Sequence, residues 1–295
     1  MKKKIGPISV IGLGIMGGAM SSNLVKAGFA VTGHDPVDKR RAELKRAGGR
    51  PAHDIAEAVQ DAPFAITSLP AAQALLDVAA ALAEVGKPGL IVIETSTLPI
   101  DVKEKARDVL AERRIVLLDC PLSGTGAQAR VRDLSVYASG PRAAVTRCKP
   151  IFEGFAREHF YLGPFGTGSK MKFLANLLVA IHNVSTAEAL VLGMKAGLDP
   201  ALAVGVLAGG AGGSRMLQVR GPMMARGKYS PATMKVGMWQ KDMKIIGDFA
   251  RALGAPTPLF DTVAPIYDAA MAQGYAEQDT ASVCAVLQKT NREGS

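Results

Sequence analysis

The first 163 residues alternate short apolar runs rich in β-branched residues with longer stretches of helical character. The short runs are PISVIGL (7–13), AVTGHD (30–35), FAITSLP (64–70), LIVIETS (90–96), IVLLDCP (115–121), LSVYASG (134–140) and HFYLGP (159–164). Strands that are regularly separated by helices form βαβ units on a parallel sheet, with right-handed crossovers. The alternation therefore predicts an α/β fold built on a doubly wound parallel sheet.

The character of the chain changes after Gly163. Long Ala- and Leu-rich stretches follow, interrupted by segments with the Gly and Pro content of loops: GLDP (197–200), AGGAGGS (208–214), YSP (229–231) and GAPTP (254–258). We therefore expect two domains, 1–164 with the parallel sheet and 165–295 all-helical.

The first predicted strand leads directly into a glycine-rich turn, VIGLGIMGGAM (10–20). Gly12, Gly14 and Gly17 stand in G-x-G-x-x-G register between this strand and a helix. In such a turn the first glycine allows the tight bend, the second lets the backbone approach a pyrophosphate, and the third lets helix and strand pack closely. The N–H groups at the helix N-terminus then face the phosphates. These features predict a Rossmann-type dinucleotide-binding domain.

Asp35 ends the second predicted strand, eighteen positions after the last glycine of the turn. This spacing is close to that at which a carboxylate binds the adenine ribose. Because a carboxylate repels a 2′-phosphate, we expect NAD to be the favoured cofactor. NADP stays possible, since Lys39, Arg40 and Arg41 follow within about one helical turn and are able to reach a phosphate. A second interpretation makes Asp35 the N-cap of the helix after Pro36.

The segment GTGSKMKFLANLLVAI (166–181) places two polar residues in an apolar stretch. Between Met171 and Ile181 every side chain is apolar except those of Lys172 and Asn176. This run is too short for a bilayer, which takes about 20 residues, so we expect a helix buried in protein. Lys172 and Asn176 are four residues apart and lie within about 40° of each other on one helix face.

A lysine on such a helix has two interpretations. An ammonium group that is desolvated in an apolar setting has its pKa lowered toward working pH, which suits a general acid or base. Alternatively, the stem of Lys172 packs along the helix while its charge reaches solvent. Asn176, with a donor and an acceptor, is able to orient a substrate oxygen or the lysine itself.

Polar residues also follow the third and fourth predicted strands, in SLP (68–70) and ETSTLP (94–99). Ligands of doubly wound sheets bind at the carboxyl ends of the strands, so these residues are candidates to contact a cofactor. Pro70 would fix one loop, and Ser96 and Thr97 would supply hydroxyl groups. The alternative for both segments is ordinary turn and capping chemistry.

A further polar segment, DCPLSGTGAQA (119–129), follows the fifth strand. Ser123 and Gly124 offer a hydroxyl group and exposed backbone N–H groups beyond a buried strand. A carboxylate can be held by such donors.

Composition argues against several other kinds of site. The three cysteines and four histidines are scattered, which suggests neither a disulfide framework nor a metal site. The net charge is +9, but the lysines and arginines are spread over the chain without interleaved aromatic residues, so we expect no nucleic-acid partner. The basic run KRRAELKR (39–46) predicts a solvated helix face, and binding of a phosphate-bearing ligand is its alternative. We predict neither a membrane span nor a leader peptide, and therefore a cytoplasmic protein.

Together these stretches resemble the β-hydroxyacid dehydrogenase family, which includes 3-hydroxyisobutyrate dehydrogenase and tartronate semialdehyde reductase. The resemblance covers nearly the whole chain, in the family's order and spacing: GLGIMGGAM (12–20), SLP (68–70), ETSTLP (94–99), DCPLSG (119–124), GTGSKMKFLAN (166–176) and WQKDM (239–243). It implies an NAD(P)-dependent oxidoreductase. The enzyme would transfer a hydride between the nicotinamide and a short β-hydroxy acid, similar to 3-hydroxyisobutyrate, or its semialdehyde.

The resemblance also implies roles for individual residues. Lys172 matches the family's catalytic lysine, a general acid in carbonyl reduction and a general base in the reverse direction. The residues implied to bind substrate are Ser123, Gly124, Asn176 and Lys241. Those implied to bind the cofactor are Gly12, Leu13, Gly14, Ile15, Met16, Gly17, Asp35, Leu69, Pro70, Ser96, Thr97 and Lys241.

Two positions depart from the family pattern. Thr125 stands where S-G-G is usual, and Ala175 where N-N is usual. Thr125 adds a branched side chain beside the expected carboxylate site, which leaves the size and polarity of the substrate open.

Three alternatives share the architecture. An imine reductase generally lacks the lysine, and a 6-phosphogluconate dehydrogenase has a much longer C-terminal part. A non-catalytic dinucleotide-binding or chromatin-associated protein would keep the fold without the chemistry, and the presence of Lys172 and Asn176 counts against it. In any of these cases the apolar segment AGLDPALAVGVLAGGAGGS (196–214) predicts a homodimer or homotetramer.

Overall fold

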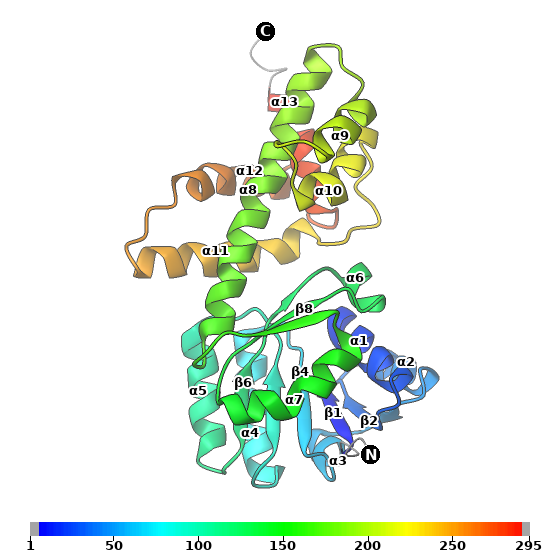
Figure 1. Ribbon diagram of the computed structural model, residues 1–295, viewed down its shortest axis with the longest axis vertical. Helices are drawn as coiled ribbons and strands as arrows, with labels where there is room; N and C mark the ends of the chain where they lie inside the picture. The colour runs from blue at the N-terminus through cyan, green and yellow to red at the C-terminus, as the bar shows by residue number, and fades with distance from the viewer. Residues whose placement is uncertain (1–5, 291–295) are drawn as a thin grey trace. The chain divides into compact units, whose positions relative to one another are not determined.

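A computed structural model describes residues 6–290 of the chain. The chain divides into two compact units between Lys172 and Phe173. This division falls inside the long helix α8 (Thr167–Lys195), drawn in green in Figure 1, whereas the boundary predicted from sequence lies just before that helix. The first unit contains the sheets.

Six parallel strands form the main sheet, in the order β3-β2-β1-β4-β5-β6. Their bounds are β1 (Ile8–Ile11), β2 (Val31–His34), β3 (Arg50–Pro51), β4 (Phe64–Thr67), β5 (Ile91–Glu94) and β6 (Val116–Asp119). The order changes direction between β1 and β4, which is the topological switch point at which sheets of this kind bind ligands. The predicted doubly wound parallel sheet is confirmed, and the short edge strand β3 adds to it.

Helices cover both faces of this sheet (Figure 1). One face packs against α1 (Ile15–Lys26), α2 (Asp38–Arg46) and α7 (Arg142–Phe155), and the other against α3 (Ile55–Val59), α4 (Ala72–Val85) and α5 (Ile100–Ala111). Successive side chains of a strand point to opposite faces, so Ile91 and Ile93 enter the first core and Val92 the second. Burial on both faces explains why the strands are continuous apolar runs.

A second, three-stranded sheet contains β7 (Leu122–Ser123), β8 (Ser135–Ala138) and β9 (Glu158–Tyr161). Strand β7 pairs antiparallel with β8, and β8 pairs parallel with β9. The sequence had suggested that β8 and β9 continue the main sheet, and this was wrong. Pro121 has no N–H with which to continue the β6 ladder, and its carbonyl accepts from Tyr137 N–H of β8 instead. The short helix α6 (Gly126–Arg130) connects β7 to β8.

The second unit is helical, as predicted. In its described residues, 173–290, the helices are accompanied by an isolated bridge between Lys235 and Asp279. Fully buried Asn183 of α8 donates hydrogen bonds to the Tyr267 hydroxyl at 3.1 Å and the Thr280 carbonyl at 2.8 Å. The helices that complete the unit are α9 (Pro200–Ala208), α10 (Arg215–Arg226), α11 (Val236–Ala252), α12 (Pro258–Ala272), the 3₁₀ helix η1 (Thr280–Ser282) and α13 (Val283–Thr290).

Helix α8 is more exposed than predicted. It has 29 residues and, by length and composition alone, is apolar enough to cross a membrane, a test that core helices also pass. Asn176 and Asn183 lie on its buried side, whereas Leu174 and Leu178, one turn apart, are 56% and 50% exposed. The expected burial therefore holds for one side of the helix and not for the side of Leu174 and Leu178.

Candidate functional site

The three glycines between β1 and α1 differ in what surrounds them. Gly12 has φ +89°, and a Cβ atom built on it would lie 2.3 Å from the Ser68 carbonyl oxygen. A Cβ atom on Gly17 would lie 1.9 Å from the Gly12 carbonyl oxygen. At Gly14 the nearest such atom is Nη1 of Arg40, at 4.0 Å. The protein's own backbone therefore requires glycine at 12 and 17, while Gly14 leaves the space that a pyrophosphate needs.

Asp35 is held inside the first unit at the end of β2. Its Oδ2 accepts from Leu13 N–H at 2.8 Å, and its Oδ1 accepts from Val37 N–H at 2.9 Å. Arg40 adds an ion pair at 3.1 Å. Because Val37 is the N-cap of α2, the interpretation of Asp35 as the cap was wrong. Asp35 instead ties the glycine turn to the end of β2. Of the three groups that contact its carboxylate, the half-exposed Arg40 side chain is the one that a ligand can displace without moving backbone.

A groove of about 520 Å³ opens beside the turn, along α1 and α2. Lys26, Arg40 and Arg130 make it positive, and Glu43 opposes them. The residues that line it are Leu13, Gly14, Ile15, Gly18, Ala19, Ser22, Asn23, Lys26, Arg40, Glu43, Leu44, Ala47 and Arg130. None of these comes from the ends of β4, β5 and β6, so the groove lies beside the predicted phosphate site rather than at the other strand ends.

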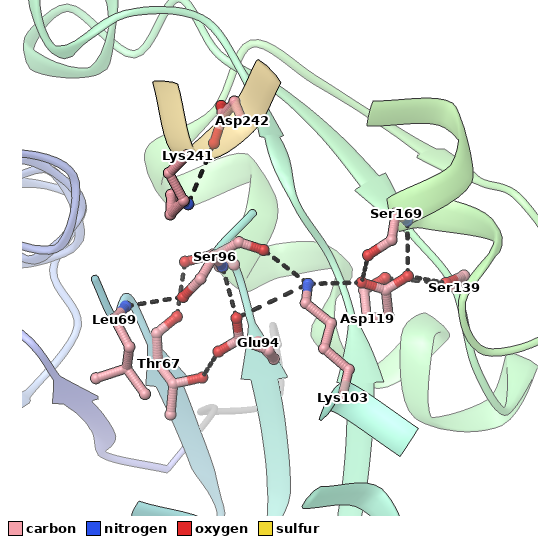
Figure 2. A network of polar contacts seen from close by, with 11 residues as sticks. Thr67, Leu69, Glu94, Ser96, Lys103, Asp119, Ser139, Ser169, Lys241 and Asp242 are labelled. Atoms are coloured by element: carbon pink, nitrogen blue, oxygen red, sulfur yellow. Dashed lines mark hydrogen bonds and ion pairs between the residues drawn. The ribbon is translucent and has the colours of Figure 1, made fainter. Parts of the chain in front are cut away.

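Polar side chains line up at the ends of β4, β5 and β6. Thr67, Glu94 and Asp119 are successive partners in the strand register, and all three are fully buried. From α5, the equally buried Lys103 donates to Asp119 Oδ1 at 2.9 Å and lies 3.8 Å from Glu94 Oε1 (Figure 2). Glu94 also accepts from the Thr67 hydroxyl and, at 2.7 Å, from Ser96 N–H. This cluster was not predicted from sequence.

Burial by itself would lower the pKa of the Lys103 ammonium group. The attraction of the Asp119 and Glu94 carboxylates, together with the hydrogen bond to Asp119, outweighs the loss of solvation and raises that pKa above its ordinary value. Lys103 is therefore a charged group in the interior of the first unit.

The two predicted cofactor loops after β4 and β5 are joined to each other. Leu69 N–H donates to the Ser96 hydroxyl oxygen at 2.8 Å. The Ser96 carbonyl accepts from the Lys103 ammonium group at 2.7 Å. The structure thus brings Leu69 and Ser96 together. Of the other two predicted residues in these loops, Thr97 is half-buried and Pro70 is exposed.

Ser123 and Gly124 lie at the end of β7. Gly124 has φ +129°, and a Cβ atom there would come within 2.6 Å of Leu134. Thr125, the departure from the family pattern, is the N-cap of α6 and forms a capping box with Gln128. Its hydroxyl group therefore accepts from the Gln128 N–H and caps the N-terminus of α6.

Asn176 and Lys241 are both held by one carboxylate of the second unit. The Asn176 amide group donates to Asp242 Oδ2 at 2.9 Å, and the Lys241 ammonium group pairs with Asp242 Oδ1 at 3.1 Å. Asn176 and Asp242 are buried, at 4% and 7% exposure, while Lys241 is 41% exposed. Lys172, half-buried, is one helical turn before Asn176 on α8. Asp242 was not singled out from sequence, although it lies within the WQKDM stretch.

Two sequence families match most of the chain. One, described as the NAD binding domain of 6-phosphogluconate dehydrogenase, matches residues 7–163. The other, described as "NAD-binding of NADP-dependent 3-hydroxyisobutyrate dehydrogenase", matches residues 166–287.

Individual proteins are similar to this chain over nearly their full length. The NAD-dependent L-serine dehydrogenase of Pseudomonas aeruginosa is 33% identical, over 92% of this chain and 94% of that protein. The L-threonate dehydrogenase of Cupriavidus necator is 32% identical, over 95% of each. The solved structure of Mycobacterium tuberculosis 3-hydroxyisobutyrate dehydrogenase with L-serine has a TM-score of 0.88 and 27% identity, and the match covers 96% of this chain and 99% of that one.

Proposed function

Since this chain belongs to the β-hydroxyacid dehydrogenase family and is an NAD(P)-dependent oxidoreductase, we propose that it oxidises a short 3-hydroxy acid, similar to 3-hydroxyisobutyrate, to its semialdehyde. The observation that carries the proposal is the polar face of α8, where Lys172 and Asn176 lie one turn apart and a buried carboxylate holds the Asn176 amide group. The relatives named for L-serine and L-threonate support the wider class of short hydroxy acids.

Lys172 is the general base in this proposal. In its neutral form its amine takes the proton from the substrate hydroxyl group, and in the reverse direction its ammonium group returns that proton to the carbonyl oxygen. The nicotinamide, when bound, supplies the hydride acceptor or donor. Because Asp242 fixes the Nδ2 end of Asn176, the amide oxygen is left to accept from the Lys172 amino group and so to orient the proposed base.

The substrate carboxylate is proposed to bind the hydroxyl group and backbone N–H groups of Ser123 and Gly124, with Lys241 supplying positive potential. Cofactor binding is proposed for residues 12–17, for Asp35, and for Leu69, Pro70, Ser96, Thr97 and Lys241. The open space at Gly14 supports the placement of the phosphates.

The direct test is turnover of a panel of acids with NAD or NADP, followed by the absorbance of reduced nicotinamide. The panel contains 3-hydroxyisobutyrate, L-serine, glycerate, 3-hydroxypropionate and L-threonate. We expect turnover of at least one acid, with NAD the better cofactor. If neither oxidation nor reduction is detected for any acid or its semialdehyde while the cofactor still binds, the proposal is wrong. That result would favour a non-catalytic dinucleotide-binding protein.

The preference for NAD is proposed to depend on Asp35 and Arg40. In Asp35→Asn the carboxylate that repels a 2′-phosphate is lost, and Arg40 loses its ion pair and becomes available to a phosphate. We expect the ratio of NADH to NADPH affinity to fall by about tenfold or more, which corresponds to about 1.4 kcal/mol. Fluorescence titration with both reduced cofactors measures it.

Arg40→Gln is the matched control for this prediction. It keeps the Asp35 carboxylate and removes the guanidinium group, so it should weaken NADPH binding further. If both variants leave the affinity ratio of the native protein unchanged, Asp35 and Arg40 do not select the cofactor.

A further inference from the structure

The first turn of α8 is capped by side chains at the ends of two strands of the first unit, β6 and β8. Gly166, which precedes the helix, has no side chain to cap it. Instead, Gly168 N–H donates to the Ser139 hydroxyl oxygen at 3.0 Å, and Ser169 N–H donates to Asp119 Oδ2 at 2.7 Å. The Ser169 hydroxyl group donates to Asp119 Oδ1, also at 2.7 Å. The N–H groups at a helix start need such partners, and a carboxylate there is favoured by the helix dipole.

This turn also touches strand backbone directly. A Cβ atom on Gly168 would lie 2.3 Å from the Tyr137 carbonyl oxygen and 2.7 Å from that of Asp119. Ser169 is 1% exposed. The start of α8 is therefore set against the ends of β6 and β8 by close packing as well as by hydrogen bonds.

One buried ammonium group connects this helix start to the predicted cofactor loops. Asp119 Oδ1, which accepts from the Ser169 hydroxyl group, also accepts from Lys103 at 2.9 Å. Lys103 in turn donates to the Ser96 carbonyl at 2.7 Å, and Ser96 accepts from Leu69 N–H. Figure 2 shows the continuous path from Leu69 through Ser96, Lys103 and Asp119 to Ser169. All of these residues belong to the first unit.

We propose that Lys103 is a positioning residue of the dehydrogenase. Through Asp119 and Ser169 it sets the first turn of α8, and with it Lys172 three residues further on, relative to the loops of Leu69 and Ser96. Lys103 is fully buried and acts through these partners, without contact to substrate or cofactor. The proposal rests on the proposed function of Lys172 and of the two loops. Because hydride and proton must move in a single geometry, a shift of about 1 Å in their donors can lower the rate about a hundredfold.

The variants are chosen with the charge of the cluster in mind. Lys103→Met alone leaves the Glu94 and Asp119 carboxylates without their cation, which endangers folding. The double variant Glu94→Gln/Lys103→Met removes one charge of each sign and keeps one excess negative charge, as in the native cluster. Glu94→Gln alone, which retains the bond between Lys103 and Asp119, is its matched control.

The first readout is amide hydrogen exchange at Gly168 and Ser169, which does not need turnover. In the double variant we expect exchange at these two amides to be faster by about tenfold or more, with amides of the first unit that lie outside this network little changed. Glu94→Gln alone should leave them close to native. Unchanged exchange at Gly168 and Ser169 in the double variant overturns the proposal, whether or not the enzyme turns over.

The second readout is kinetic. We expect kcat of the double variant to fall by about 10- to 100-fold with NADH affinity within about twofold, and the primary deuterium isotope effect with 4-deuterated NADH to change. Arg220→Met removes another buried cation, the partner of Asp279 in the second unit, and should lower stability while leaving the isotope effect and the Gly168 and Ser169 amides unchanged. If Arg220→Met reproduces the effects, the role is only structural and the proposal fails.

The two readouts separate the two proposals. In one outcome the native protein turns over no acid of the panel, while the double variant still shows faster exchange at Gly168 and Ser169. This outcome refutes the proposed function but not the role of Lys103 in setting the helix start. An active native enzyme whose double variant shows faster exchange but native kcat and isotope effect refutes the role of Lys103 in catalysis.

Discussion

Lys172→Met is expected to lower kcat by about a thousandfold, because the variant has no group to take or return the proton of the substrate hydroxyl. General acid–base catalysis typically contributes about 10²- to 10⁴-fold. The affinity for NADH should be unchanged within about twofold, since the glycine turn and the loops of the first unit are untouched. Steady-state kinetics with the best acid of the panel and fluorescence titration with NADH measure the two quantities.

Lys170→Met provides the matched control. Lys170 is exposed and lies two residues earlier on α8, so this variant removes the same charge from the same helix without removing the proposed base. It should retain nearly native kcat. Equal losses in the two variants, or native activity in Lys172→Met, would contradict the assignment of Lys172.

Gly17→Ala is expected to lower the free energy of unfolding by about 3 kcal/mol or more. Its Cβ atom would lie 1.9 Å from the Gly12 carbonyl oxygen, and two backbone segments cannot separate as easily as flexible side chains do. Gly14→Ala is expected to change stability by no more than about 0.5 kcal/mol, because its surroundings are open. It should nevertheless weaken NADH binding by about tenfold or more, since the methyl group takes the space of the phosphates.

Denaturant unfolding and NADH titration are carried out on both variants. Gly14→Ala is the control for the stability measurement, and Gly17→Ala is the control for the binding measurement. A Gly14→Ala protein that binds NADH as tightly as the native protein would show that phosphates do not approach there. A Gly17→Ala protein of native stability would show that α1 is able to move away from β1.

Sequence reasoning succeeded where the determining interactions are local. The order of strand, turn and helix around Gly12, Gly14 and Gly17 depends on backbone conformation within a few residues, and the shared face of Lys172 and Asn176 follows from helical spacing. The parallel sheet was predictable as well, because strands buried on both faces are continuous apolar runs. The motifs that carry the family resemblance are of the same local kind.

The errors and omissions concern partners that are distant in sequence. Asn176 meets Asp242 across 66 positions and Asp119 meets Ser169 across 50, and no local pattern reports such pairings. The antiparallel pairing of β7 with β8 and the bond from Leu13 N–H to Asp35, 22 positions further on, were missed for this reason. A faint signal was present, since Glu94 and Asp119 each end an apolar strand and Lys103 lies in the helix between these two strands.

The sequence by itself determined the class of fold, the glycine-rich turn and the helix that carries the proposed base, since each follows from the periodicity and chemistry of neighbouring residues. Tertiary structure alone decided which groups meet. Strand register aligned Thr67, Glu94 and Asp119, and packing of α5 placed Lys103 among them. A buried charge is stable only beside partners of opposite charge, and those partners are selected by the three-dimensional arrangement of strands and helices.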